Sequence, residues 1–492
     1  MQMQLSQDIN RLLQQPVPLL TLESDQENEA LQLLLEFCRN MGETVYRWSV
    51  TDGLSTMVFG LSVDKSGVEH NAEELLQSIK SRNSGGVYVL CDFDPFLRDN
   101  PKIIRLLKDI ALAFEQIPKR IVLLGHRIHL PPELTAFSAC ARLALPTESE
   151  ILAIIRQQAR RYAAQNQQRR IRTDNTALQQ LTASLRGMTQ RDVARLAWHA
   201  IADDGVISQS DLAEVSSAKF ALLNREGLLH YEYDTENFAN VGGLDNLKQW
   251  LQLRQQAFSG DGKLDAPRGI LLLGVQGGGK SLAARAVAGM WNLPLLRLDM
   301  GSLYNKYIGE TEKNLRESLQ QAEVMSPCVL WMDELEKALA QGGSDDGLSK
   351  RLLGYLLTWM ADKKRPVFLV ATSNNIQQLP AELVRKGRFD EIFFVDLPDA
   401  KIRAEIFSIH LRKRDIDPDK LQLARVAEAS EGFSGAEIEQ AVVSALYRLG
   451  ESQPLREDHL ITAILNTSPL SVVMAEQVES LRDWAEARAV RA

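Results

Sequence analysis

Short apolar runs punctuate the second half of the chain, and longer mixed stretches separate them. The runs at 270–273, 327–332 and 367–371 each end in glycine, acidic or small polar residues. Runs of this length between turn residues predict buried strands of a parallel sheet, and the stretches between them predict covering helices. The pattern therefore predicts an α/β fold with a parallel sheet flanked by helices.

The first half of the chain repeats this rhythm with weaker motifs. The matched residues, in chain order, are Asp92 with Asp333, Glu133 with Glu382, Pro146 with Pro398 and Gly187 with Gly432. Because the members of each pair lie 241 to 252 residues apart and keep one order, an internal duplication is predicted. An ordinary α/β domain shares the same alternation of strands and helices, and it is the alternative interpretation.

The clearest chemical motif follows the run at 270–273. Residues 274–281 read GVQGGGKS, which fits GxxxxGK[ST] between a predicted strand and a predicted helix. Its last three glycines allow backbone N–H groups to face a polyphosphate. These glycines are Gly277, Gly278 and Gly279. Lys280 is placed to reach the outer phosphates and Ser281 to hold Mg²⁺, so the motif predicts a nucleotide site.

A second motif ends the run at 327–332, where Asp333 and Glu334 follow one another. Adjacent strand residues point to opposite sides, so the two carboxylates are expected to differ in role. Asp333 is suited to bind the metal, and Glu334 to orient and polarise the water that attacks the outer phosphate. The alternative is an acidic strand end that caps the next helix.

Residues 236–468 resemble the AAA family of ring ATPases, in its classical subgroup, because several motifs occur in family order. These motifs are the segments 238–244, 274–281, 327–334, 367–374, 379–390 and 432–437. The resemblance implies a P-loop module that binds ATP with Mg²⁺ and hydrolyses the ATP, followed by a helical lid. It also implies assembly into a homo-oligomeric ring of six subunits.

The resemblance assigns roles to individual residues around the nucleotide. Val241 and Gly242 would lie nearest the adenine base. Asn374 would be the polar sensor beside the attacking water, with Ser373 as the alternative one residue earlier. Three further residues would face the nucleotide from the lid side, namely His410, Gly435 and Ala436.

Arg385 and Arg388 look like the arginine fingers that reach into the nucleotide site of a neighbouring subunit. An arginine supplied in trans is worth about 10³ to 10⁵ in rate, so a monomer is expected to hydrolyse ATP slowly. The alternative is that both arginines are solvated surface charges.

The segment 303–312 resembles the central-pore loop with which AAA unfoldases grip a polypeptide. Tyr307 would be the gripping aromatic, Ile308 its aliphatic partner and Lys306 a pore-lining cation. The implied partner is a protein substrate. Because aromatics bury readily, packing of Tyr307 at a subunit interface is the alternative.

The whole chain is similar to a bacterial and plastid family of AAA ATPases in which a degenerate AAA-like domain precedes one ATPase module. The expected divisions are an AAA-like domain at 1–214 with its lid at 147–214, a linker at 215–237, the ATPase large subdomain at 238–396, its lid at 397–468 and a terminal helix at 469–492. The first copy has acidic residues at 24–29 in place of the phosphate loop, so it is expected to be inactive. The terminal helix is expected to dock on the lid or on the next subunit.

Composition adds limits to this interpretation. With 45% hydrophobic and 24% charged residues, the chain has the make-up of a globular protein. No apolar run is long enough to span a bilayer and no signal segment is evident, which predicts a cytoplasmic protein. The four cysteines lack metal-ligand spacing and are predicted to be reduced core residues.

Two other functions stay open at this stage. A basic stretch would suit nucleic-acid phosphates, although a net charge of −8 argues against a general nucleic-acid binder. Its members are Arg156, Arg160, Arg161, Arg169, Arg170 and Arg172, interleaved with Tyr162. A nucleotide-gated adaptor, which would use ATP to switch partners without threading a substrate, is the third candidate.

Overall fold

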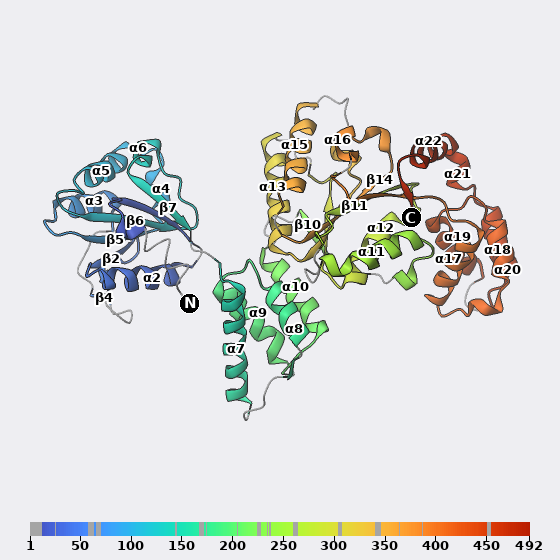
Figure 1. Ribbon diagram of the computed structural model, residues 1–492, viewed down its shortest axis with the longest axis horizontal. Helices are drawn as coiled ribbons and strands as arrows, with labels where there is room; N and C mark the ends of the chain where they lie inside the picture. The colour runs from blue at the N-terminus through green and yellow to red at the C-terminus, as the bar shows by residue number, and fades with distance from the viewer. Residues whose placement is uncertain are drawn as a thin grey trace. The chain divides into compact units, whose positions relative to one another are not determined.

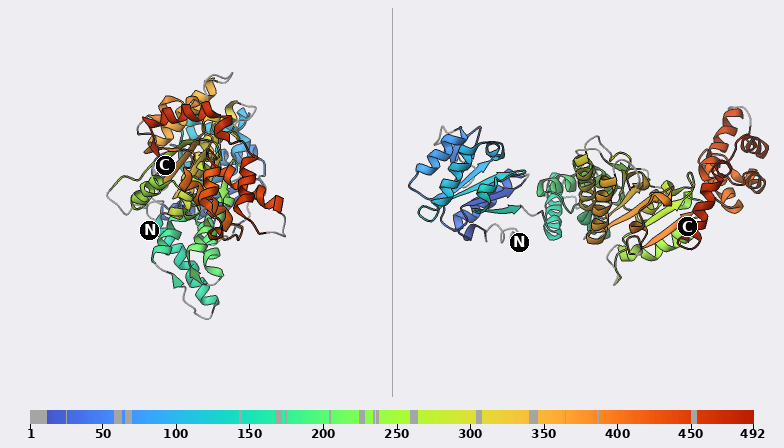
Figure 2. Two further views of the ribbon diagram at one scale, coloured as in Figure 1. Left: turned by 90° about the vertical axis from the view of Figure 1, so that its right-hand side faces the viewer. Right: turned by 90° about the horizontal axis from the view of Figure 1, so that it is seen from above.

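The computed structural model describes residues 12–24, 26–57, 63–64, 70–142, 145–166, 172–173, 175–203, 205–223, 228–233, 235, 238–258, 264–303, 308–339, 346–363, 365–385, 387–449 and 454–492. The chain separates between Glu150 and Ile151 into two compact units. Each unit contains one seven-stranded sheet with helices on both faces (Figures 1 and 2). The predicted α/β class is therefore confirmed.

The first unit holds the amino-terminal sheet. Its strands are β1 (Leu19–Glu23), β2 (Val45–Ser49), β3 (Gly53–Met57), β4 (Val63–Asp64), β5 (Gly86–Cys91), β6 (Lys119–Gly125) and β7 (Ser138–Arg142). Its helices are α2 (Glu27–Asn40), α3 (Ala72–Ser81), α4 (Asp94–Leu97), α5 (Pro101–Leu112) and α6 (Pro132–Thr135). Buried side chains of α3 and α5 pack on one face of the sheet, and those of α2 pack on the other.

The second unit begins with a helical region. It contains α7 (Glu148–Gln165), α8 (Asn175–Ser184), α9 (Gln190–Ala202) and α10 (Gln209–Leu223), with the short strands β8 (Arg172–Thr173) and β9 (Val206–Ile207). These helices share one apolar core, to which α7, α8, α9 and α10 each contribute buried residues. The sequence divides the chain after 214, whereas compactness groups the helices from α7 onward with the second sheet.

The second sheet is surrounded by the remaining elements. Its strands are β10 (Leu229–Glu232), β11 (Gly269–Gly274), β12 (Leu295–Asp299), β13 (Cys328–Asp333), β14 (Val367–Ser373), β15 (Glu391–Val395) and β16 (Val490–Arg491). Its helices are η1 (Phe238–Asn240), α11 (Asp245–Phe258), α12 (Lys280–Trp291), α13 (Ile308–Val324), α14 (Glu336–Leu339), α15 (Asp346–Asp362), η2 (Ile376–Gln378) and α16 (Ala381–Val384). The helical lid and the carboxyl end follow with α17 (Ala400–Arg412), η3 (Pro418–Lys420), α18 (Leu423–Ala429), α19 (Gly435–Leu449), α20 (Glu457–Leu465), α21 (Leu470–Val473) and α22 (Ala475–Glu486).

The two sheets share one central strand order. The second runs β12-β13-β14-β11-β15, all parallel, with β10 antiparallel at one edge and β16 at the other. In the first sheet, the parallel strands β2-β5-β6-β1-β7 take the places of β12-β13-β14-β11-β15 in turn. Each central sheet is followed by a run of helices, α7 to α10 in one case and α17 to α20 in the other. This shared order is what the predicted duplication requires.

Backbone conformation refines the matched pairs. Gly187 and Gly432 have φ values of 77° and 78°, in agreement with their pairing. Asp92 has φ 51° directly after β5, and the residue with this conformation after β13 is Glu334, at φ 52°. The structure thus pairs Asp92 with Glu334, one residue beyond the pairing with Asp333 that the sequence suggested.

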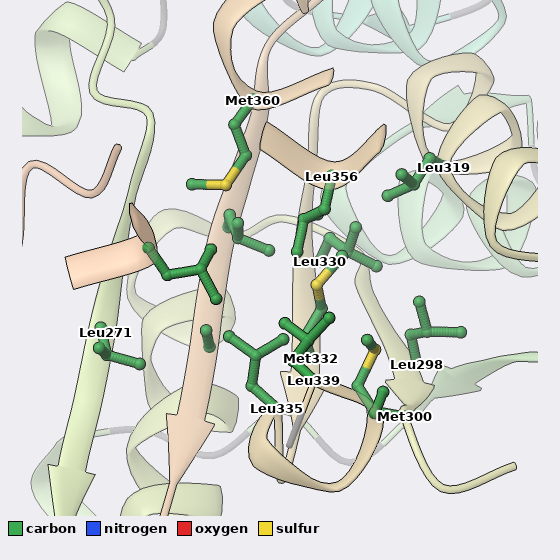
Figure 3. Packing of buried hydrophobic residues seen from close by; sticks show 14 of the residues in the cluster. Leu271, Leu298, Met300, Leu319, Leu330, Met332, Leu335, Leu339, Leu356 and Met360 are labelled. Carbon is green, nitrogen blue, oxygen red and sulfur yellow. The ribbon is translucent and has the colours of Figure 1, made fainter. Parts of the chain in front are cut away.

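The second sheet buries two apolar layers, one on each face. Strand β13 contributes alternately to them, with Leu330 and Met332 toward α13 and α15, and Val329 and Trp331 toward α11 and α12. Figure 3 shows the first layer, where leucine and methionine side chains of the strands meet Leu319 of α13 and Leu356 of α15. This burial holds the polar ends of the strands at fixed positions.

The carboxyl end closes the second sheet. The sequence predicted docking of a terminal helix on the lid or on the next subunit. Instead, Leu481 and Ala485 of α22 join the apolar layer on one face of the second sheet, and β16 pairs with β15. The preceding segment touches the lid, where the backbone N–H of Leu470 donates to Glu437 Oε1 at 2.7 Å.

Lys219 of α10 fixes the helical region to the second sheet's layer of helices. The side chain is 1% exposed, and its Nζ donates to the carbonyls of Ser184, Arg186 and Val324 at 2.7, 2.7 and 2.6 Å. Burial lowers the pKa of Lys219 to about 7, while the three carbonyl oxygens favour its charged form. Since Val324 is the last residue of α13, the end of that helix is tied to α10.

Lys219→Met should lower the free energy of unfolding by about 3 kcal/mol, because buried carbonyls would lose their donor. Urea denaturation followed by circular dichroism measures the change. The matched control is Lys401→Met, at an exposed position of α17, which should stay within about 0.5 kcal/mol of the parent chain. Equal effects of the two substitutions would contradict the role given to Lys219.

The cysteine prediction is correct for three of four positions. Cys38, Cys91 and Cys328 are buried free thiols, but Cys140 is exposed. Cys140 lies on β7, an edge strand of the first sheet, and the sequence does not reveal which face of that strand is covered. Among the described residues, no helix has the length and apolar character that crossing a membrane requires.

Candidate active site

The phosphate-loop motif forms the turn between β11 and α12. Gly279 precedes α12 with φ 100°, a conformation that side-chain-bearing residues rarely adopt. Gly277 has φ 76°, and a Cβ there would lie 2.9 Å from Ser434 Oγ of the lid. The backbone therefore approaches the lid closely while the N–H groups at the start of α12 stay available to an anion.

Lys280 is buried within the curl of this loop. Its Nζ donates to the carbonyl oxygens of Gly274 and Val275, each at 2.8 Å, and the residue is 7% exposed. Burial lowers the pKa of Lys280 to about 8, and nearby carboxylates, Glu336 first among them, act in the opposite direction. A cation is thus held at the point where the loop would meet outer phosphates.

The chemistry of the donor set fits Mg²⁺. Ser281, the next residue of α12, is exposed at the helix start, where its hydroxyl is available to a metal. Asp333 ends β13 with its side chain 16% exposed, and its Oδ1 accepts a hydrogen bond from Thr372 Oγ1 at 2.8 Å. A hydroxyl and a carboxylate are hard oxygen ligands of the kind that Mg²⁺ prefers beside phosphates.

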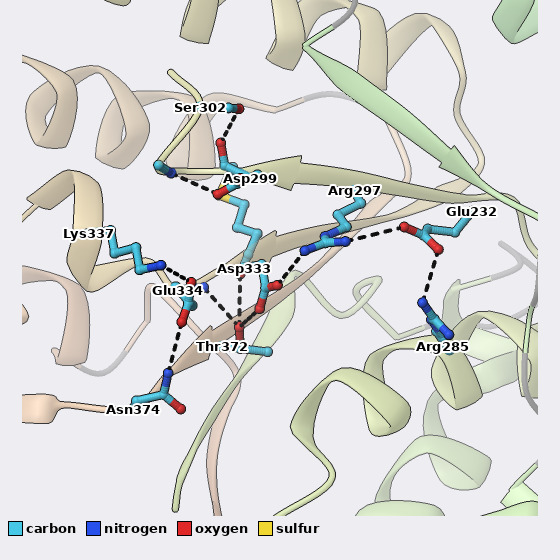
Figure 4. A network of polar contacts seen from close by, with 12 residues as sticks. Glu232, Arg285, Arg297, Asp299, Ser302, Asp333, Glu334, Lys337, Thr372 and Asn374 are labelled. Atoms are coloured by element: carbon cyan, nitrogen blue, oxygen red, sulfur yellow. Dashed lines mark hydrogen bonds and ion pairs between the residues drawn. The ribbon is translucent and has the colours of Figure 1, made fainter. Parts of the chain in front are cut away.

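Glu334 stands beside Asp333 but is held by a different set of contacts (Figure 4). Its backbone N–H donates to Thr372 Oγ1 at 3.1 Å, and its Oε1 accepts from Asn374 Nδ2 at 3.3 Å. Its Oε2 forms an ion pair with Lys337 of α14. The two carboxylates therefore point into distinct surroundings, as expected for two roles.

The sensor position involves Asn374 directly. Its amide contacts Glu334, and its backbone N–H donates to Glu336 Oε1 at 2.9 Å. Ser373 is fully buried, and its Oγ donates to the carbonyl of Asn375 at 3.3 Å. Of the two candidates, Asn374 is the one that the structure brings to Glu334.

The segment expected to touch adenine lies between the sheet's helices and the lid. Val241 is 3% exposed and packs with the layer that includes α12. Gly242 faces α17, because a Cβ there would lie 2.8 Å from Ile406 Cγ1. The next residue, Gly243, donates its N–H to Glu405 Oε2 at 3.3 Å.

The lid also meets the phosphate loop. The backbone N–H of Ala436 donates to the carbonyl of Gly277 at 3.2 Å, and Gly435 lies against the same carbonyl. His410 is on α17 with its side chain 16% exposed, and its Nδ1 lies 3.5 Å from Glu439 Oε1. Burial lowers the pKa of His410, and Glu439 opposes that shift.

The two arginines beyond α16 differ in their surroundings. Arg385 follows α16 directly and is exposed. Arg388 is half-buried, and its Nη1 lies 3.5 Å from the carbonyl of Leu357 on α15. The structure does not bring either arginine to the phosphate loop of its own chain.

The pore segment falls mostly outside the described residues. Lys306 and Tyr307 are not described, and Ile308 is placed only as the first backbone position of α13. Their roles stay predictions.

The polar residues at the site that the sequence did not indicate include Glu232, Arg297, Glu336, Lys337 and Thr372. Arg297 and Asp299 break an apolar strand, and this alternation was the available signal for a charged side chain on the face that also carries Asp333. Lys337 lies three residues after Glu334, and the turn between them, closed by the Lys337 N–H on the Glu334 carbonyl at 2.9 Å, brings the two side chains together. No local signal connects Glu232 with the site, because the pairing of β10 with β12 is long-range.

Models of known protein families match three segments of the chain. Residues 270–397 match the ATPase family associated with various cellular activities (AAA), residues 5–141 the SpoVK-like AAA ATPase N-terminal domain, and residues 149–226 the second domain of SpoVK-like AAA ATPases. An AAA domain-containing protein, ycf46, of Trieres chinensis is 33% identical over 99% of this chain and 98% of its own length. The chain belongs to the AAA family of ATPases.

The chain is also similar to other proteins. The ycf46 protein of Pyropia yezoensis is 35% identical over 98% of both chains. The cell division cycle protein 48 homologue of Archaeoglobus fulgidus is 33% identical over 42% of this chain and 30% of its own. Among solved structures, the FIGL-1 AAA domain covers 56% of this chain and 96% of its own, with a TM-score of 0.46 and 22% identity.

Proposed function

We propose that this AAA protein binds ATP with Mg²⁺ and hydrolyses the ATP. The observation that carries the proposal is the meeting of Glu334 and Asn374 beside Asp333, at the strand ends next to the loop that holds Lys280. Two carboxylates in distinct surroundings near a phosphate loop fit metal binding and water activation as separate tasks.

Each residue of the site has a proposed role in metal binding, nucleotide binding or water activation. Ser281 and Asp333 would hold Mg²⁺, which, when bound, neutralises charge on the phosphates. Lys280 would exchange its contacts with loop carbonyls for phosphate oxygens. Glu334 would accept a proton from the attacking water at a carboxylate oxygen, with Asn374 orienting it. Val241, Gly242, His410, Gly435 and Ala436 would enclose the nucleotide between sheet and lid.

Assembly and location belong to the same proposal. An arginine that acts on a neighbour's nucleotide requires a head-to-tail interface, and such an interface closes into a ring or grows into a filament. The exposure of Arg385 supports this role, and the ring is proposed to contain six subunits in the cytoplasm. Within the basic stretch, Arg161 stacks over the Trp198 ring at 4.9 Å, which favours a structural role for this arginine over nucleic-acid binding.

The proposed substrate is a protein segment gripped by residues 306–308 in the centre of the ring. Tyr307→Ala should leave the basal ATPase rate within about twofold of the parent and remove its stimulation by a permanently unfolded, carboxymethylated model protein. Steady-state ATPase assays with and without that protein measure both quantities. Full stimulation of Tyr307→Ala would exclude threading by this residue and favour a nucleotide-gated adaptor.

A further inference from the structure

The strand that leads into the ATPase module places a carboxylate near the predicted metal ligand. Strand β10 pairs antiparallel with β12, with Glu232 opposite Leu295. Glu232 has an 18% exposed side chain, and its Oε2 accepts from Arg285 Nη2 of α12 at 3.3 Å. Its Oε1 lies 3.8 Å from Arg297 Nη1.

Arg297 connects this carboxylate with Asp333. Its Nη2 donates to Asp333 Oδ2 at 3.0 Å, while the guanidinium lies over the Trp331 ring at 4.8 Å from its centre. Strand register explains the reach, because Arg297 pairs with Trp331 and Asp333 follows two residues later on the same face. Figure 4 shows the resulting row of alternating charges from Arg285 through Glu232 and Arg297 to Asp333.

The row is balanced as it stands, with two guanidinium groups and two carboxylates. A divalent cation at Asp333 would meet Arg297 as a neighbouring positive charge that already occupies one carboxylate oxygen. Repulsion between partly buried charges at such separations is only weakly screened. Arg297 and a metal ion would therefore compete for the same carboxylate. Glu232 provides a second carboxylate with which the Arg297 guanidinium can pair.

We propose that Arg297 competes with Mg²⁺ for Asp333, and that Glu232 on strand β10 weakens this competition by holding the guanidinium. Both are positioning residues, since neither is placed to touch the nucleotide. The inference rests on the proposed metal site at Asp333. The segment before the ATPase module thereby gains a role. Displacement of β10 would remove Glu232 from Arg297, strengthen the pairing of Arg297 with Asp333, and raise the Mg²⁺ concentration needed for tight ATP binding.

Opposite substitutions separate this role from a structural one. Arg297→Met keeps an unbranched apolar stem and removes the charge, so it should tighten Mg²⁺ binding by about 10-fold. Glu232→Gln leaves Arg297 with Asp333 as its main anion, so it should weaken Mg²⁺ binding by about 3- to 10-fold. In the double variant the effect of Glu232→Gln should vanish, because the competing cation is gone.

The experiment uses the full chain carrying Glu334→Gln to suppress hydrolysis. Binding of a fluorescent ATP analogue is measured in EDTA and along an Mg²⁺ titration, for the parent and the three variants. Melting followed by circular dichroism checks that each variant folds, and Arg297→Gln replaces Arg297→Met if the latter does not. We expect Arg297→Met to lower, and Glu232→Gln to raise, the Mg²⁺ concentration at which the analogue binds tightly.

Three results overturn parts of the account, and they can be told apart. Equal Mg²⁺ dependence of all variants, or shifts in one direction, would overturn the competition while leaving the ATP site intact. A persistent Glu232→Gln effect in the double variant would show that Glu232 acts without Arg297. A parent chain that binds the analogue without any response to Mg²⁺ would instead contradict the proposed function itself.

Discussion

Replacement of Glu334 by glutamine should lower kcat for ATP hydrolysis by about 10²- to 10⁴-fold. Glutamine keeps the size of the side chain and its hydrogen bond with Asn374, but it cannot accept the proton of the attacking water. ATP affinity should change by less than about threefold, since Lys280 and the phosphate loop are unaltered. Steady-state phosphate release gives the first quantity, and binding of a fluorescent ATP analogue gives the second.

The matched control is Glu382→Gln. Glu382 is an exposed residue of α16, and its substitution should leave both kcat and ATP affinity at parent values. Parent-like turnover by Glu334→Gln would show that another group activates water. Loss of ATP binding would instead mean that Glu334 serves to hold the loop, with Lys337 and Asn374 as its structural partners.

Arg385→Ala should reduce the ATPase rate by about 10³- to 10⁵-fold if the exposed guanidinium completes the site of a neighbouring subunit. Arg448→Ala is the control, because Arg448 is an exposed arginine on α19 far along the chain from the proposed finger. It should retain the parent rate. Phosphate release at a fixed protein concentration compares the two variants.

Mixing distinguishes action in trans from action within one subunit. In a ring containing both Arg385→Ala and Glu334→Gln subunits, some interfaces join an intact Glu334 to an intact Arg385. Two inactive variants should therefore recover measurable activity when mixed. Failure to recover, with each variant still able to assemble, would indicate that Arg385 acts on the nucleotide of its own subunit and would contradict its role as a finger.

Local motifs explain why much of the site could be predicted. The phosphate loop, Asp333 and Glu334 follow apolar strands within a few residues, so their spacing alone indicates the strand ends that carry them. Parallel strands then bring those ends to one edge of the sheet, where Asn374 at the end of β14 meets Glu334. Here, local pattern and sheet topology agree.

Contacts that depend on register or on docking were not predictable in the same way. The link from Glu232 to Asp333 requires that β10 pair antiparallel with β12 at one register. The packing of α22 on the apolar layer of the second sheet and the burial of Lys219 depend on which apolar faces meet. Weak sequence matches also cannot resolve a one-residue shift in the alignment of the two halves, such as the shift of Asp92 from Asp333 to Glu334.

If the ATP site is completed between subunits, the mass of the Glu334→Gln variant should depend on bound nucleotide. This variant is expected to bind ATP with Mg²⁺ and to hydrolyse the ATP only slowly, so its assembled state should persist. Light scattering across a range of protein concentrations should give a mass near six chains with ATP and Mg²⁺ and a smaller mass without them. A monomer at every concentration, despite bound ATP, would contradict the composite site and the ring.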